Sequence, residues 1–164
     1  MFVAAELVLP LPMGVAREAL ARAAHDGGLV SASRRAVGDG LQFVMPVGPW
    51  GEHGPAKAVH VRLLPGRTVG DKFVMGMRWE VPGPSGKMFP SLDADMALSS
   101  SGAGQTLLSV AACYEPPLHR LGKTLDRALM SKVAARTMEA LLTDVASRLH
   151  ALAAAESESN TAPL

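Results

Sequence analysis

The stretch from Lys72 to Leu149 decides the fold, and it is carried by RWEVPGPSGKMFPSLDADMAL at 78–98, LLSVAACYEPPLHRLGKTLDRAL at 107–129 and SKVAARTMEALLTDVASRL at 131–149. In the first two segments apolar residues alternate with polar or small ones, as in strands that bury one face. The third has apolar residues at helical spacing. Short loops rich in Pro, Gly and Ser at 82–86 and 99–104 join successive strands, so we expect antiparallel neighbours.

The upstream sequence adds a strand, two short helices and further strands. Phe2 to Leu9 is predicted to be a half-buried strand that Pro10 and Pro12 end. Helices are predicted at 15–24 and 29–37, since glycine pairs follow both segments. A five-strand antiparallel meander is then predicted, with strands at 41–47, 59–63, 73–80, 92–98 and 108–114. The plan is α+β with about six strands and no βαβ rhythm.

The predicted C-terminal helix carries two apolar stripes, about half a turn apart. Residues 121, 125, 129 and 133 form the first stripe, and the second is formed by Ala134, Met138, Leu141, Leu142, Val145, Leu149 and Leu152. Because one straight helix cannot bury both against a sheet, we predict a short helix at 118–130, a break near Met130, and a main helix to about Ala154. The chain is thus expected to form one domain over 1–154, followed by a flexible polar tail at 155–164.

Composition excludes several classes of partner. Sixteen basic and 15 acidic residues give a net charge of +1, and aromatic residues make up only 4%, so no nucleic-acid partner is expected. No run of about 18 apolar residues occurs, and the apolar N-terminus lacks a basic start, so no stable membrane insertion is expected and the cytoplasm is the default location. The single cysteine, Cys113, cannot form an intrachain disulfide and is expected to be buried and inert.

Motifs for cofactors, metals and nucleophiles are weak. The segment from Pro117 to Thr124 echoes a P-loop but has proline where the first glycine belongs. The five histidines lack metal-ligand spacing, and no G-x-S-x-G motif occurs. Asp93 and Asp95 share a strand face with Arg78, which favours cross-strand ion pairs over acid–base chemistry. We therefore expect no cofactor and no metal, and the catalytic residues, if any exist, stay unknown.

The order of elements, with WE at 79–80, FP at 89–90, LDAD at 92–95, YEPPL at 114–118 and LDR at 125–127, resembles the SRPBCC or START-like helix-grip superfamily, and most closely its uncharacterised bacterial members. The resemblance covers nearly the whole chain. It implies a curved antiparallel sheet of about six strands wrapped around a long C-terminal helix, with two short helices after the first strand and an apolar cavity between sheet and helix. Members share the cavity and differ in what fills it, so no ligand is implied.

Inner positions of sheet and helix are the candidates for lining this cavity. Several are methionines, whose flexible and polarizable side chains suit an adaptable apolar surface, although they also serve as ordinary core fillers. Trp79 and Tyr114 would supply polar groups, unless they bond to backbone in a packed core. The predicted lining residues are Phe43, Val61, Met75, Met77, Trp79, Leu92, Met96, Val110, Tyr114, Met138, Leu142 and Val145.

The expected function is the binding of a small hydrophobic molecule, such as a lipid, a polyketide-like compound or an isoprenoid. One alternative is a cyclase or dehydratase, which would need an acid–base group in the cavity and has only Tyr114, Trp79 and Arg127 as candidates. A second alternative is an interaction protein whose interior is filled. The oligomeric state is left open.

Overall fold

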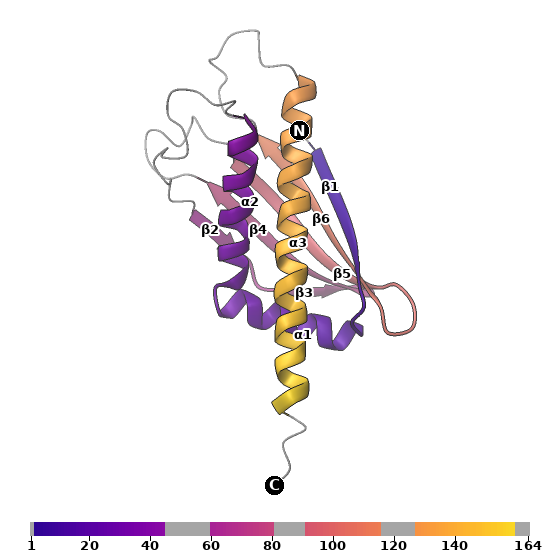
Figure 1. Ribbon diagram of the computed structural model, residues 1–164. Helices are drawn as coiled ribbons and strands as arrows, with labels where there is room; N and C mark the ends of the chain where they lie inside the picture. Colours follow the sequence, from indigo (N-terminus) through magenta and orange to yellow (C-terminus); the bar gives the residue numbers. More distant parts are fainter. Residues whose placement is uncertain (1, 45–59, 81–90, 116–126, 160–164) are drawn as a thin grey trace.

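The computed structural model describes residues 2–44, 60–80, 91–115 and 127–159 (Figure 1). The elements follow in the order β1 (Phe2–Leu9), α1 (Met13–His25), α2 (Gly28–Val44), β2 (His60–Leu63), β3 (Arg67–Val69), β4 (Lys72–Glu80), β5 (Ser91–Ser100), β6 (Thr106–Glu115) and α3 (Arg127–Ser159). This is the predicted α+β helix-grip arrangement, with six antiparallel strands, two helices after the first strand and a long C-terminal helix.

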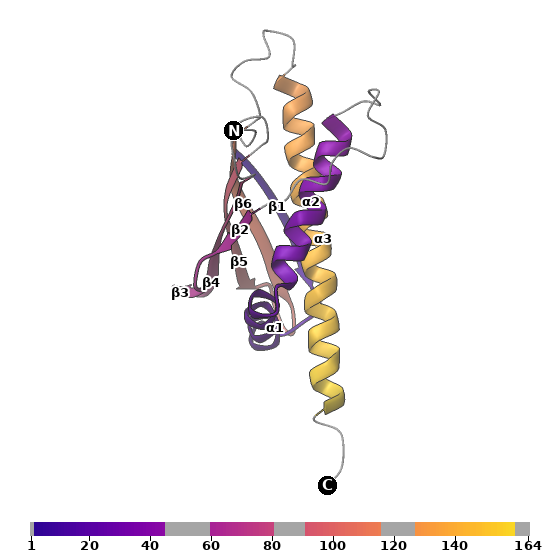
Figure 2. The same cartoon turned by 90° about the vertical axis from the view of Figure 1, so that its left-hand side faces the viewer.

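The strands form one sheet in the order β1-β6-β5-β4-β2, and β3 pairs with β4 off this path. All pairings are antiparallel. The β5–β6 turn holds Gly102 at φ 119° and Gly104 at φ 74°, backbone conformations that other residues rarely adopt. The three helices lie on one face of the sheet, and the opposite face is left uncovered by any described helix (Figure 2).

The interior lies between the sheet and the three helices. The second apolar stripe of the C-terminal helix is buried against it, from Ala134 to Leu149, which confirms that part of the helical-wheel argument. Helix α1 contributes Leu20 and three alanines, whose small size lets the helix approach closely. Ion pairs hold α3 to the other two helices, one between Arg22 and Glu156 and one between Arg35 and Asp144.

Two predicted boundaries are wrong, and one strand was not predicted. Helix α2 continues to Val44, through the positions where a strand was expected to begin at Leu41. Glycine in a helix costs about 1 kcal/mol relative to alanine, which lowers stability without forcing an end, so Gly38 and Gly40 do not stop α2. The remainder of that predicted strand, with Met45 and Val47, lies outside the described residues. Strand β3 was not predicted, because it has only three residues.

The predicted break in the C-terminal helix is also absent. Helix α3 runs without interruption through Met130 and on to Ser159, so residues 155–159 of the expected tail are helical. The backbone hydrogen bonds of a helix are made within the segment, so a change of apolar stripe does not by itself end it. Residues 118–126 of the predicted short helix lie outside the described part of the chain.

Cys113 is exposed, against the expectation that it is buried. Alternation along β6 places Val110 and Ala112 towards the helices and Cys113 on the opposite face. An apolar strand therefore does not bury all its residues when helices cover only one side of the sheet.

Candidate functional site

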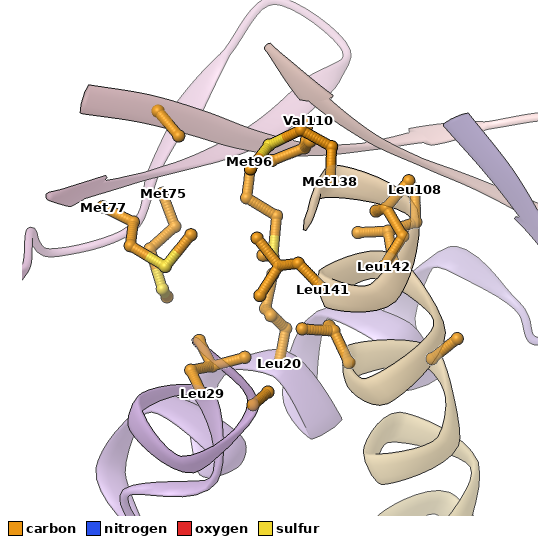
Figure 3. Packing of buried hydrophobic residues seen from close by; sticks show 14 of the residues in the cluster. Leu20, Leu29, Met75, Met77, Met96, Leu108, Val110, Met138, Leu141 and Leu142 are labelled. Carbon is orange, nitrogen blue, oxygen red and sulfur yellow. The ribbon is translucent and has the colours of Figure 1, made fainter. Parts of the chain in front are cut away.

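The inner face of the sheet is built from cross-strand rows. Trp79 pairs with Val61 on one side and with Leu92 on the other, and Leu92 pairs with Tyr114. The third row along contains Met75, Met96 and Val110. Helix α3 adds residues from the opposite side, and Figure 3 shows Met96, Met138 and Leu142 among the side chains of one apolar cluster.

Most predicted lining residues meet in this cluster, and they are closely packed. Nine have exposed fractions of 0 to 5%, namely Met75, Met77, Trp79, Leu92, Met96, Val110, Met138, Leu142 and Val145. Val61 is partly buried against them, whereas the side chains of Phe43 and Tyr114 are outside the described set. Phe43 lies on α2, in place of the expected strand. A side chain facing a ligand-sized hollow would keep accessible surface towards it, so neighbouring side chains fill the interior around these nine.

Trp79 stands out because its polar group has no partner in the part of the chain that the structure describes. The side chain is 1% exposed, and its indole Nε1–H has no hydrogen-bond acceptor among the described residues. A buried donor left without an acceptor costs about 1–3 kcal/mol. Buried indole N–H groups normally find a partner, so an acceptor placed beside this donor would be stabilised.

Ser33 is a buried polar residue that the sequence reasoning missed. Its Oγ lies 2.8 Å from the carbonyl oxygen of Leu29 and 3.1 Å from Sδ of Met77. The hydroxyl has one proton and sulfur accepts weakly, so the carbonyl is the stronger acceptor. The sequence signal was present, because Leu29, Ser33 and Ala36 share one face of α2 by their spacing.

The buried polar side chains of the described interior are Ser33, Thr106 and Thr137, none of which titrates near neutral pH. Within the described ranges, no cluster of three His, Cys, Asp or Glu residues has the geometry to hold a metal ion. In the same part of the chain, no helix has the length and apolar character needed to cross a membrane. The side chain of Arg127, the other candidate for a polar group in the cavity, is not described.

A separate groove of about 450 Å³ lies between α2 and the edge strand β2, and it is lined by Val30, Arg34, His60, Val61, Arg62, Arg78 and Glu80. The predicted cross-strand ion pairing is confirmed for Arg78 of β4 and Asp93 of β5, whose Nε and Oδ1 lie 3.6 Å apart. Within β4, Arg78 Nε also lies 3.7 Å from Oε2 of Glu80. The contribution of Arg34 was not predicted, because only the packing of α2 beside β2 brings it to these strands.

No protein-family model and no curated protein matches the chain. Among solved structures, the chain is similar to TTHA0849 from the bacterium Thermus thermophilus, with 16% identity and a TM-score of 0.46. It is also similar to Ara h 8.0201, with 10% identity and a TM-score of 0.41. Each of the two similarities covers 92% of this chain and 98% of the other. At these scores neither match bears on function, and the fold assignment rests on element order and strand pairing.

Proposed function

We propose that the protein binds a small, mainly apolar molecule between the sheet and α3, and that the indole N–H of Trp79 donates a hydrogen bond to it. The unpartnered, buried Nε1–H of Trp79 is the observation that carries the proposal. Transfer of the ligand's apolar surface out of water would drive binding, and the indole would orient it. Lipids, polyketide-like compounds and isoprenoids that carry a carbonyl or hydroxyl oxygen fit this description.

The packed interior can make room because of its methionines. Met75, Met77 and Met96 come from the sheet and Met138 from α3, and all are nearly fully buried. An unbranched side chain with three rotatable bonds can change rotamer at lower cost than leucine or valine, so these residues can repack around a guest. Binding is therefore expected to open the interior, with little space preformed around the nine packed residues.

The first experiment is native mass spectrometry of protein purified from its own host, followed by solvent extraction of any bound mass. A stoichiometric apolar adduct would support the proposal and identify the ligand class. The second step uses Trp50→Phe, which leaves Trp79 as the sole tryptophan of the chain. The extracted ligand should then shift the indole N–H resonance of Trp79 in proton NMR.

Trp79→Phe provides the matched variant, since it keeps an aromatic ring and removes only the donor and part of the ring system. Loss of one neutral hydrogen bond, about 0.5–1.5 kcal/mol, predicts a ligand affinity roughly 2- to 13-fold lower. Unchanged affinity together with an unmoved indole resonance would contradict the assigned role of Trp79.

The filled interior favours a second candidate, an interaction protein without a ligand. Exposed fractions near zero at the nine packed residues are what an ordinary core would show. A clean apo mass, combined with no binding of extracted host lipids, would favour this candidate. The enzyme alternative would draw on Tyr114, Trp79 and Arg127, since the buried polar residues of the described interior, Ser33, Thr106 and Thr137, are not acid–base groups. An enzyme that uses the phenol of Tyr114 should lose turnover and retain affinity in Tyr114→Phe.

A further inference from the structure

The groove between α2 and β2 carries an excess of positive charge. Three arginines line it, Arg34 from α2, Arg62 from β2 and Arg78 from β4, and Glu80 is the one carboxylate among the described residues that line it. His60 adds a ring nitrogen that can donate or accept a hydrogen bond. A concave surface lined mainly by one sign of charge concentrates ligands of the opposite sign.

Glu80, which lines the groove, and the nearby Asp93 are both engaged by one of the three arginines. Arg78 lies within 4 Å of both Glu80 and Asp93. Arg34 and Arg62 form no ion pair with any described residue, whereas the next arginine along α2, Arg35, is paired with Asp144 at 2.6 Å. Two guanidinium groups therefore line the groove without an ion-pair partner among the described residues, and such groups bind carboxylates and phosphates through paired hydrogen bonds.

The groove also has an apolar side, which connects it to the interior. Val30 and Val61 line it, and Val61 packs against the core cluster and pairs directly with Trp79 in the sheet. Cross-strand partners have Cβ atoms about 4.5–5.5 Å apart, so the groove lies one residue away from the unpaired indole. Its volume of about 450 Å³ falls within the usual range for small-molecule sites, roughly 300–1,000 Å³.

We infer that the ligand is an anionic amphiphile, whose carboxylate or phosphate group binds Arg34 and Arg62 while its apolar body passes Val61 towards Trp79. This inference rests on the proposed binding function and narrows it to one chemical class. The groove would hold the charged end in contact with water, so the interior would have to accommodate only the apolar end. That division avoids the high cost of burying a charge in a core whose described residues include no ionisable group.

The test uses four probes of graded chemistry, namely octanoate, octyl phosphate, 1-octanol and inorganic phosphate, in calorimetric titrations at low salt. Octanoate or octyl phosphate should bind at least tenfold more tightly than 1-octanol and than inorganic phosphate, and the tighter of the two identifies the anionic group.

Arg34→Gln and Arg62→Gln should each weaken this binding roughly tenfold, the effect of losing one charge-assisted hydrogen bond, and leave the binding of 1-octanol unaffected. Arg67→Gln is the matched control, because Arg67 is exposed on β3 and does not line the groove.

The outcomes separate this inference from the proposed function. Equal affinity for octanoate and 1-octanol, insensitive to both arginine substitutions, would overturn the anionic class and leave apolar binding intact. Inorganic phosphate binding as tightly as octyl phosphate would show a bare anion site and overturn the amphiphile. Arginine-dependent octanoate binding that leaves the indole resonance of Trp79 unmoved would overturn the interior site, and the linked inference with it. If no probe binds, both fail.

Discussion

The two faces of strands β4 and β5 meet opposite environments, although successive residues of the same two strands point to them in alternation. On the inner face, Met77, Trp79 and Met96 are 1–3% exposed beneath the helices. On the outer face, the side chains of Arg78 and Asp93 are 55% and 63% exposed. Burial of a large apolar side chain contributes about 1.5–3 kcal/mol, and an exposed ion pair contributes about 0–1 kcal/mol. Stability therefore comes mainly from the inner face.

The comparison also locates the groove. Strand β2 is the sheet edge at which inner and outer residues become accessible from one side, since Val61 faces the core whereas His60 and Arg62 face outward. The apolar and charged faces thus come together at this edge, next to α2. Substitutions on each face test how far the two differ.

The largest effect is expected for truncation of inner-face residues. Leu98→Ala removes a side chain with 0% exposure, and Met96→Ala one with 1% exposure. Each should lower the free energy of unfolding by about 2–5 kcal/mol, measured by urea denaturation, because a cavity remains where the side chain packed. A cost below about 1 kcal/mol for Met96→Ala alone would contradict close packing there and would indicate room for a ligand.

A smaller effect is expected at the rim of the inner layer. Thr106 is fully buried, and its Oγ1 donates a hydrogen bond of 2.7 Å to the carbonyl oxygen of Leu11, beyond the end of β1. Thr106→Val keeps the shape and removes the donor, so the unfolding free energy should fall by about 1–3 kcal/mol. Thr68→Val is the control, because Thr68 is exposed on β3, and it should change stability by less than about 0.5 kcal/mol. An equal effect of both substitutions would show that this hydrogen bond adds nothing.

The division into two faces was predictable, because it is encoded locally. Period-two alternation placed Met77, Trp79 and Met96 together and Arg78 with Asp93, and pairing of the strands then followed from short loops. The buried stripe of α3 followed from its helical period in the same way. Ten of the twelve predicted lining residues are described with their side chains, and all ten lie in the core or against it.

The remaining features depend on tertiary packing, which local patterns do not encode. The side of the sheet that the helices cover decides that Cys113 is exposed. Placement of α2 beside β2 decides that Arg34 lines the groove. The lack of an acceptor near Trp79, among the residues that the structure describes, depends on every neighbour at once. Helix α2 itself continues past two glycines, because their weak local preference does not by itself end a helix.

Exposed ion pairs are expected to contribute little to stability. The ion pair of Arg35 and Asp144 joins α2 to α3. A double-mutant cycle on these two residues should give a coupling free energy of about 0.2–1 kcal/mol that decreases in 1 M salt. The same cycle on Arg78 and Asp93 should give less, because their shortest distance is 3.6 Å compared with 2.6 Å. Coupling above about 2 kcal/mol for either pair would show that these exposed charges contribute as buried ones do.

Cys113 offers the smallest expected effect and the most direct probe of the uncovered face. It lies between Phe2 of β1 and Asp93 of β5 on the outer face, and it is exposed. Cys113→Ser should therefore change the unfolding free energy by less than about 0.5 kcal/mol. Its thiol should react with an aromatic disulfide reagent in the folded protein within a few fold of the rate in urea, since access does not require unfolding. If the thiol reacted only after denaturation, something would cover this face in solution. The contrast between the two faces would then hold only for the isolated chain.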